Sequence, residues 1–161
     1  MIQSAFVVQL VGLFESPLNS VLVTEYLAGG DLITRTAPDD YCLTERKCQI
    51  FIRQIVRGVQ FIHSQRILHL DLKPFNIMFA NPDDDYNLRI IDFGLAEEMK
   101  VEDSEEVIQV MLMIDMAELA VLVMMPLMTP TQVEMTMCGT LEYMSPEVMD
   151  CRFASPASDM W

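Results

Sequence analysis

Four polar residues are concentrated around short apolar segments in the middle of the chain. Asp71, Lys73 and Asn76 lie two and three residues apart in ILHLDLKPFNIMFA, between two apolar runs. Asp92 follows another apolar run, LRII, and stands twenty-one residues after Asp71. Residues in the loops beside strands are often the ones that a rigid scaffold positions for function. Packing alone does not explain two carboxylates, an amide and an ammonium group at such places.

This combination of side chains suits the transfer of a phosphoryl group. Mg²⁺ prefers hard oxygen ligands, typically one or two carboxylates together with phosphate oxygens. The reaction also requires a cation on the moving phosphate, and a base or positioning group for the incoming hydroxyl. Because the four residues supply each of these parts, their spacing predicts a phosphotransfer site.

An antiparallel hairpin and a short helix are predicted near the start of the chain. Residues 5–14 and 21–27 are rich in apolar and β-branched residues, which favours two strands. ESPLNS between them contains turn-forming Ser, Pro and Asn. Gly29 and Gly30 interrupt the second strand, and DLITRTA after them favours a short helix.

The clearest helix is predicted over residues 44–64. Thr44 is a suitable N-cap, because its hydroxyl can accept a hydrogen bond from the first turn. Apolar residues recur at the spacing of one buried helix face. They are Cys48, Phe51, Ile52, Ile55, Val59 and Ile62. His63 is interpreted as a residue at the helix end that suits the helix dipole.

Two further strands are predicted at NIMFA (76–80) and LRIID (88–92), around the acidic turn NPDDDYN.

The composition changes after these strands, since residues 99–137 contain nine of the 14 methionines. Asp103 and Glu106 favour a capped helix that runs toward residue 124. This Met-rich block is interpreted as a loop insertion, a promiscuous binding helix, or sequence foreign to the native fold.

Length and charge limit the classes of function. The 161 residues suit one domain, and 52% of them are hydrophobic, enough for a real core. The formal net charge of −14 argues against a nucleic-acid partner, because a phosphate-neutralising surface is not expected. Residues 107–128 are the most apolar stretch, but Asp115, Glu118 and Pro126 interrupt them. We therefore predict no membrane span.

The four cysteines do not indicate a metal site. None of them forms a C-x-x-C pair, and the two histidines are not placed to complete a zinc site. The start MIQSAFVVQL lacks the basic region of a signal peptide. We expect a reduced, cytoplasmic protein in which all four cysteines are buried structural thiols.

Three motifs resemble those of the eukaryotic protein kinases. They are HLDLKPFN (69–76), DFG (92–94) and GTLEYMSPE (139–147), in the order of the family. DLKP resembles the serine/threonine class. HLDLKP resembles the myosin-light-chain-kinase, death-associated-kinase and Trio-like group of the calmodulin-dependent branch. TEYLAGGDL (24–32) is similar to the hinge between the kinase lobes, and SDMW (158–161) to the start of the central helix.

The resemblance implies an α+β fold, the two-lobed protein kinase fold, present in part over the chain. Residues 5–30 would form the end of the N-lobe and the hinge. Residues 31–98 would form the C-lobe part that contains the catalytic loop and DFG. Residues 99–137 would be a Met-rich insertion in the activation segment, and 138–161 would end that segment and begin the central helix.

The resemblance also implies catalytic roles. Asp71 would accept or orient the proton of the substrate hydroxyl, and Lys73 would balance charge on the γ-phosphate. Asn76 and Asp92 would hold Mg²⁺. Thr140 would form a hydrogen bond near Asp71.

Further positions would bind ATP. Thr24 would be the gatekeeper, and the backbones of Glu25 and Leu27 would form hydrogen bonds with adenine. Asp31 would meet the ribose, and Met78 would form an apolar floor under the base.

Several residues would support these groups rather than bind ligand. Asp159 would brace the backbone of the catalytic loop. His69, Phe93 and Leu10 resemble packed core residues that align the lobes. Leu70 replaces the usual Arg before Asp71, and Leu cannot pair with a phosphorylated activation loop. Calmodulin-type or autoinhibitory regulation would then come from outside this chain.

The expected function is that of a protein serine/threonine kinase, which uses ATP and Mg²⁺ to phosphorylate a protein substrate. One alternative is a catalytically inactive, kinase-like binding module. Another is a truncated or mis-spliced product. Since no Gly-rich phosphate loop, V-A-I-K lysine or glutamate partner is present, we expect the chain alone to be weakly active or inactive.

Overall fold

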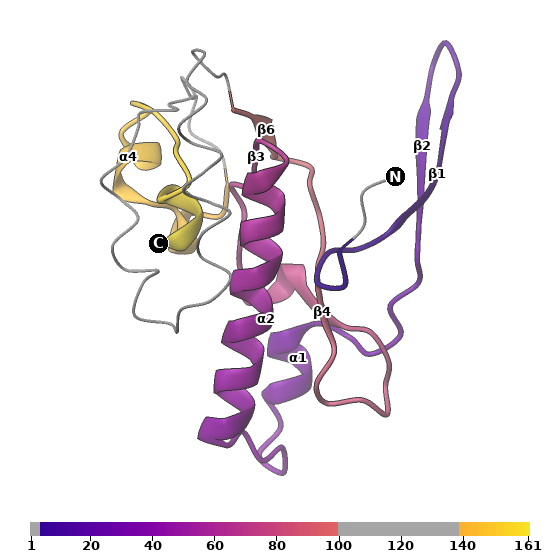
Figure 1. The fold of residues 1–161 in the computed structure, drawn as a ribbon, viewed down its shortest axis with the longest axis vertical. Helices are drawn as coiled ribbons and strands as arrows, with labels where there is room; N and C mark the ends of the chain where they lie inside the picture. The colour runs from indigo at the N-terminus through magenta and orange to yellow at the C-terminus, as the bar shows by residue number, and fades with distance from the viewer. Residues whose placement is uncertain (1–3, 100–138) are drawn as a thin grey trace. The chain divides into compact units, whose positions relative to one another are not determined.

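The computed structural model describes residues 4–99 and 139–161, which contain both helices and strands. This mixture confirms the predicted α+β class (Figure 1). The chain divides into two compact units, each described by itself. The first unit comprises Met1–Phe61 and Lys73–Asp92, and the second comprises Ile62–Leu72 and Phe93–Trp161. Residues 100–137 of the Met-rich block, its predicted helix and Cys138 lie outside the described residues.

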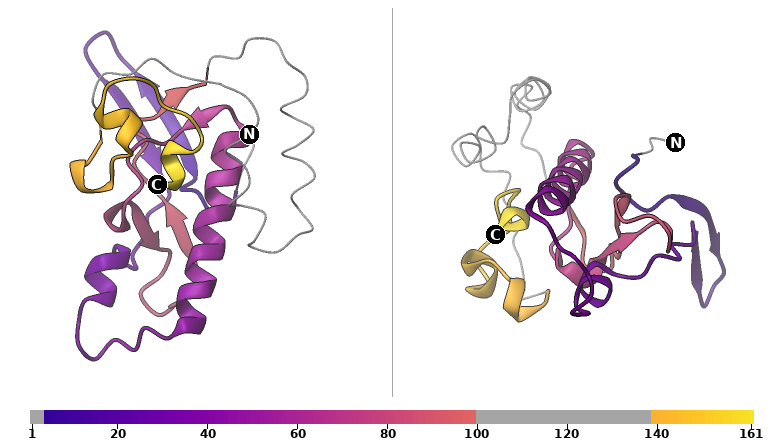
Figure 2. Two further views of the ribbon diagram at one scale, coloured as in Figure 1. Left: turned by 90° about the vertical axis from the view of Figure 1, so that its left-hand side faces the viewer. Right: turned by 90° about the horizontal axis from the view of Figure 1, so that it is seen from below.

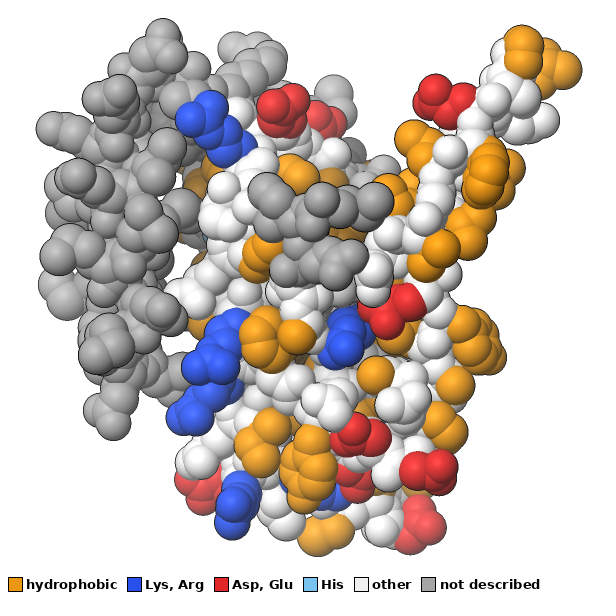
Figure 3. All heavy atoms as spheres, turned by 45° about the vertical axis from the view of Figure 1, so that its right-hand side comes forward, with side chains coloured by type: hydrophobic (Ala, Val, Ile, Leu, Met, Phe, Trp, Pro, Cys, Tyr) orange, Lys and Arg blue, Asp and Glu red, His pale blue; other side chains and the backbone are white. Residues whose placement is uncertain are grey.

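Strands β1 (Leu10–Glu15) and β2 (Ser20–Thr24) form the predicted antiparallel hairpin in the first unit. Both strands are shorter than predicted, because residues 5–9 and 25–27 lie outside them. Ser16 closes the turn, since its hydroxyl accepts a hydrogen bond from the Asn19 N–H at 3.0 Å. The hairpin is exposed along its length, and Figure 3 shows hydrophobic side chains on it.

A second hairpin in the first unit is formed by β4 (Ile77–Phe79) and β5 (Leu88–Ile90). Both strands are shorter than predicted, since β4 covers only residues 77–79 of the predicted 76–80, and β5 only 88–90 of the predicted 88–92. β4 begins later because Pro74–Asn76 form a turn of 3₁₀ helix, η1. The short predicted helix is present as α1 (Leu32–Thr36). Unlike the first hairpin, this one is well buried, with Phe79 and Ile90 among the most enclosed side chains.

Helix α2 (Glu45–Ser64) confirms the predicted long helix. The Thr44 hydroxyl accepts a hydrogen bond from the Lys47 N–H at 3.2 Å, as an N-cap does. Phe51 and Val59 are buried, but Ile52 is 50% exposed, so its predicted place in the core is wrong. Ile52 lies at the edge of the buried face, which is centred nearer to Phe51 and Gly58.

Gly58 explains where α2 meets the β4–β5 hairpin, whose strands lie beside the helix in Figure 2. A methyl group added to Gly58 would come within 2.6 Å of the Ile90 Cδ1 atom. Phe51 packs on Phe79 edge to face, with ring centroids 5.5 Å apart. The core of the first unit therefore lies between α2 and this hairpin.

The second unit contains the last turn of α2 and a set of short elements. They are β3 (Ile67–Leu68), β6 (Glu97–Glu98), η4 (Leu141–Tyr143), α4 (Pro146–Met149) and η5 (Ser158–Met160). β3 pairs antiparallel with β6. The core of this unit is the cluster Leu68, Met99, Met144, Val148 and Ala154, against which Leu70 packs.

The prediction that all four cysteines are buried is wrong for the three that the structure describes. Cys42 and Cys151 are exposed, and Cys48 is partly exposed. Cys42 lies in the loop before α2, and Cys151 follows α4, so neither belongs to a buried face. In the described part of the chain, no helix is long and apolar enough to cross a membrane.

Candidate active site

Asp71 is held by the segment that follows the Met-rich block. Its carboxylate oxygen Oδ1 accepts hydrogen bonds from the Thr140 hydroxyl at 2.8 Å and from the Thr140 N–H at 3.0 Å. Gly139 permits this approach, because a Cβ atom there would lie 2.7 Å from the Leu70 carbonyl oxygen. Gly139 also has a φ of +104°, which favours glycine. Asp71 is therefore a buried carboxylate whose orientation is fixed by the two hydrogen bonds from Thr140.

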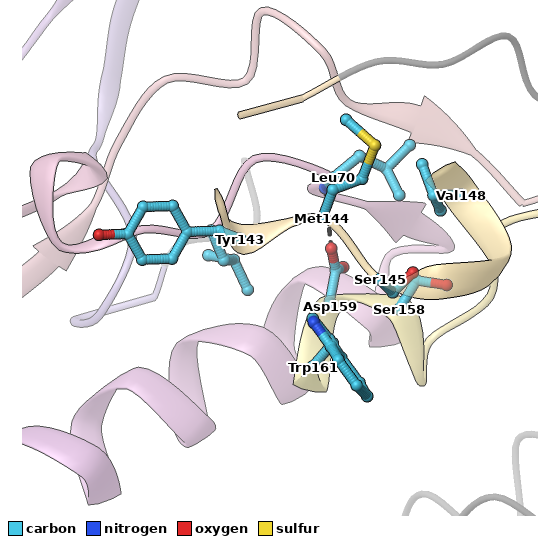
Figure 4. Close-up of a pocket in the computed structure, with 9 residues that line it drawn as sticks. Leu70, Tyr143, Met144, Ser145, Val148, Ser158, Asp159 and Trp161 are labelled. Carbon is cyan, nitrogen blue, oxygen red and sulfur yellow. Dashed lines mark hydrogen bonds between the residues drawn. The ribbon is translucent and has the colours of Figure 1, made fainter. Parts of the chain in front are cut away.

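Asp159 holds the backbone immediately before Asp71. Its carboxylate accepts hydrogen bonds from the His69 N–H at 2.9 Å and from the Leu70 N–H at 2.8 Å. Figure 4 shows Asp159 directed toward Leu70. Leu70 has a φ of +64°, a left-handed conformation that costs free energy for a side chain of this kind. The Asp159 carboxylate thus stabilises the strained backbone that positions Asp71.

His63 is a second partner of Asp159, and no pattern in the sequence indicated this contact. Its Nε2 atom lies 2.8 Å from Asp159 Oδ2, and both side chains are buried. The interpretation of His63 as a simple helix-end residue is therefore wrong. The sequence gives little local signal for this contact, because the partner of His63 lies 96 residues later. The one local hint is that His63 directly follows the buried Ile62.

His69 and Phe93 pack against each other, with ring centroids 5.0 Å apart. His69 is completely buried, and its Nδ1 atom accepts a hydrogen bond from the Asp71 N–H at 3.3 Å. Leu10, by contrast, is 37% exposed on β1, so its interpretation as a core residue is wrong in this structure. The exposure follows from the hairpin that carries it, whose strands are largely exposed among the described residues.

Glu147 and Ser158 form another polar contact in the second unit. The Ser158 hydroxyl donates a hydrogen bond to Glu147 Oε1 at 2.6 Å. Burial raises the pKa of Glu147, but hydrogen bonds, chiefly from Ser158, outweigh it and leave the pKa below its ordinary value. Glu147 therefore stays ionised on folding and ties α4 to η5.

A small pocket lies between these elements and the backbone of residues 70–72 (Figure 4). Its lining includes Leu70, Met144, Val148 and Trp161. The cavity volume of about 30 Å³ is room for about one water molecule. The pocket is therefore too small to be a nucleotide site.

In the first unit, Asn76 and Asp92 flank the same end of the β4–β5 hairpin. Ile77 pairs with Ile90, and the Ile91 N–H donates to the Asn76 carbonyl at 2.9 Å. Asp92 follows directly, with a φ of +63°. An amide oxygen and a carboxylate fit the hard-ligand preference of Mg²⁺, with phosphate oxygens to complete the shell. Among the described residues, no group of three His, Cys, Asp or Glu side chains forms a metal site.

Lys73 stands at the start of η1 in the first unit, and its carbonyl accepts a hydrogen bond from the Asn76 N–H at 2.8 Å. Asp71 and Thr140 belong to the second unit. In the second unit, the structure therefore brings Asp71 and Thr140 together. Lys73, Asn76 and Asp92 all belong to the first unit.

The hinge residues lie at the end of the exposed hairpin. Thr24 ends β2 opposite Leu10, and the Glu25 N–H donates to the Gln9 carbonyl at 2.9 Å. The Glu25 side chain accepts a hydrogen bond from the Gln9 N–H, also at 2.9 Å. Leu27 is buried. The backbone between Glu25 and Leu27 is thus the point where the exposed hairpin ends and the core begins.

Asp31 and Met78 are neighbours across a short backbone bridge. Asp31 is the N-cap of α1, because its Oδ1 atom accepts a hydrogen bond from the Thr34 N–H at 2.8 Å. Burial raises the pKa of Asp31, but hydrogen bonds from Thr34 outweigh it and lower the pKa overall. Asp31 is thus an ionised side chain beside the strand that carries Met78.

Comparison with known proteins gives relatives of one kind, all of them protein kinases by name. The family model for the protein kinase domain matches residues 1–161. Myosin light chain kinase 3 of Danio rerio is 36% identical over 154 residues, which are 96% of this chain and 17% of that protein. Smooth-muscle myosin light chain kinase of Gallus gallus is also 36% identical, over 96% of this chain and 6% of that protein. Myosin light chain kinase 2 of Homo sapiens is 35% identical, over 96% of this chain and 21% of that protein. The chain thus spans only a minor part of each of these relatives.

Proposed function

The chain belongs to the protein kinase family, and on that premise we propose that it transfers the γ-phosphate of ATP to a Ser or Thr hydroxyl of a protein. The observation that carries this proposal is the geometry of Asp71. Two donors of Thr140 fix one of its oxygens, and Asp159 fixes the backbone before it. A base that must meet an incoming hydroxyl has to be positioned in this way.

In the proposed reaction, Asp71 orients the substrate hydroxyl and accepts its proton. Lys73 balances negative charge on the γ-phosphate as the phosphoryl group moves. Asn76 and Asp92 would hold Mg²⁺, which when bound neutralises charge on the phosphate oxygens. The common position of Asn76 and Asp92 at one end of the β4–β5 hairpin supports this assignment.

The nucleoside of ATP would lie at the hinge. The Glu25 and Leu27 backbones would form hydrogen bonds with adenine beside the gatekeeper Thr24. Asp31 would bind the ribose, and Met78 would lie under the base. The bridge between Asp31 and Met78 supports this assignment, because it keeps the two groups at one place in the first unit.

The family also supports a proposal for the substrate and for the route of regulation. The relatives are named for the light chain of myosin, and we propose a protein substrate of that kind, in the cytoplasm. Leu70 packs against the core of the second unit and carries no charge. Control by a phosphate that pairs with this position is therefore not expected, and calmodulin-type or autoinhibitory control from outside the chain is the proposed route.

The test compares Asp71→Asn and Asp92→Asn with the exposed control Asp150→Asn in the full-length protein, because the chain alone is expected to be weakly active or inactive. The assay is transfer of phosphate from MgATP to purified myosin light chain. Each site variant should lose at least about 100-fold in kcat/KM, whereas Asp150→Asn should stay within about twofold of the wild type.

Two results would contradict the proposal. Turnover that is unaffected by both site variants would mean that other residues perform the chemistry. A wild-type protein that binds MgATP with no transfer, and keeps its partner binding in Asp92→Asn, would be a kinase-like binding module instead.

A further inference from the structure

Arg35, on α1, connects three backbone carbonyl groups in the first unit. Its Nη1 atom donates to the Gly29 carbonyl at 3.2 Å and to the Asn81 carbonyl at 2.9 Å. Its Nη2 atom donates to the Pro82 carbonyl at 2.7 Å. One guanidinium therefore joins the turn before α1 to the loop after β4. No sequence motif indicated this role.

The guanidinium is held from two other sides. Asp85 accepts a hydrogen bond from Nη2 at 2.7 Å, and the Phe79 ring lies 4.5 Å from the Arg35 Cζ atom. Lys47 of α2 binds the other oxygen of Asp85 at 2.8 Å. The Arg35 side chain is only 16% exposed. These contacts fix both the position and the plane of the guanidinium.

The two segments that Arg35 joins are also paired through their backbones. The Gly29 N–H donates to the Phe79 carbonyl at 3.2 Å, and the Phe79 N–H donates to the Gly30 carbonyl at 2.9 Å. The bridge between Asp31 and Met78 continues this pairing by one step. Gly29 allows the close approach, since a Cβ atom there would lie 2.5 Å from the Phe79 Cβ atom. Arg35 thus reinforces the short ladder that carries Asp31 and Met78.

We propose that Arg35 is a positioning residue for the nucleoside part of ATP. The inference rests on the proposed function, which assigns Asp31 to the ribose and Met78 to the base. Arg35 acts through these two residues: it keeps the turn before α1 in register with β4. A lysine could retain the charge near Asp85, but its point-like ammonium cannot reach three carbonyl groups in one plane.

The experiment compares Arg35→Lys with the control Lys47→Gln, which removes the other cation at Asp85. Binding of adenosine and of MgATP to the purified protein is measured by calorimetry, and kcat and KM by the transfer assay. Arg35→Lys should weaken both ligands by the same factor, about tenfold, and raise the KM for ATP. The kcat and the KM for the protein substrate should stay within about twofold. Lys47→Gln should bind both ligands as the wild type does.

The equal loss for adenosine and MgATP is the decisive result, because adenosine lacks the phosphates. A folded Arg35→Lys variant with wild-type adenosine affinity would overturn the inference and leave the proposed function intact. A lower kcat with unchanged affinities would also overturn it, since that result describes a structural role only. A wild-type protein that binds neither adenosine nor MgATP would overturn the proposed function, and this inference with it.

If Arg35→Lys does not fold, Asp85→Asn provides the same test. It removes the charged partner that orients the guanidinium and leaves the three carbonyl contacts. We expect the affinities for adenosine and for MgATP to fall by the same factor, about threefold. Wild-type affinity in Asp85→Asn would then overturn the inference.

Discussion

Asp159 in the second unit and Asp85 in the first unit are both carboxylates with several donors, but their surroundings differ. The Asp159 side chain is 1% exposed, and it binds His63 and two backbone N–H groups. The Asp85 side chain is 35% exposed, and it binds Arg35 and Lys47. The Asp159 carboxylate completes a buried network, and the half-buried Asp85 carboxylate joins two cations that are each 16% exposed.

This difference determines what each carboxylate contributes. Donors that lose a buried acceptor keep their full desolvation cost, because no water can replace the acceptor. Donors at the surface recover hydration, so an exposed ion pair contributes little to the free energy of unfolding. We therefore infer that Asp159 maintains the fold around Asp71, whereas Asp85 mainly directs Arg35.

The largest expected effect on the free energy of unfolding comes from Asp159, the buried carboxylate. Asp159→Ala removes the acceptor of His63 and of the His69 and Leu70 N–H groups. The free energy of unfolding, measured by urea titration, should fall by about 3–5 kcal/mol. Asp150→Ala is the matched control, because Asp150 forms only an exposed ion pair with Arg152.

The control should change the free energy of unfolding by less than about 0.5 kcal/mol. A loss below about 1 kcal/mol for Asp159→Ala would show that water or another acceptor takes the place of the carboxylate. The distinction between the two carboxylates would then not hold.

The sequence predicted the elements whose signals are local. The β1–β2 hairpin follows from two β-rich runs around ESPLNS, and α2 follows from Thr44 and a periodic apolar face. Exposure was less predictable, since it depends on what each element packs against. Ile52 and Leu10 were both expected in the core and are exposed for this reason.

The site could be predicted only in part from the residues. Spacing placed Asp71, Lys73 and Asn76 in one loop, but the contact between Asp71 and Thr140 joins residues 69 positions apart. The family resemblance implied that contact, and spacing did not. No local pattern pairs His63 with a carboxylate 96 positions later.

Glu147, a half-buried carboxylate that accepts a hydrogen bond from Ser158, sharpens the comparison. Its lowered pKa means that its contribution to stability is present above the unfolded pKa, near 4.5, and is lost as the pH falls through the folded value. Ser158→Ala removes the hydrogen bond and leaves the burial, which raises the pKa. The free energy of unfolding at neutral pH should fall by about 1 kcal/mol.

The effect of Ser158→Ala should also depend on pH. The difference from the wild type should be largest at neutral pH and should shrink as Glu147 becomes protonated in acid, measured as unfolding free energy against pH. In a Glu147→Gln background, Ser158→Ala should lose this pH dependence. A difference that stays constant with pH would assign the loss to the Ser155 N–H, which donates to the same hydroxyl at 3.2 Å.

The smallest expected effect belongs to Asp85, the half-buried carboxylate. The hydrogen bond from Lys47 and the contact with Arg35 hold the pKa of Asp85 below its ordinary value, against a smaller effect of burial. Its stabilisation is therefore present above the unfolded pKa, near 3.8, and is lost as the pH falls through the lowered value. Asp85→Asn should lower the free energy of unfolding by less than about 1 kcal/mol at neutral pH.

Salt distinguishes the two carboxylates most directly. At about 1 M NaCl the Debye length is only about 3 Å, so exposed charges are largely screened while buried pairs are not. The loss in Asp85→Asn should shrink toward zero in urea titrations at that salt concentration, and the loss in Asp159→Ala should persist. If both losses persisted equally, the Asp85 cluster would be as protected from solvent as Asp159. Arg35 would then hold the segments that carry Asp31 and Met78 through an interaction that is shielded from solvent.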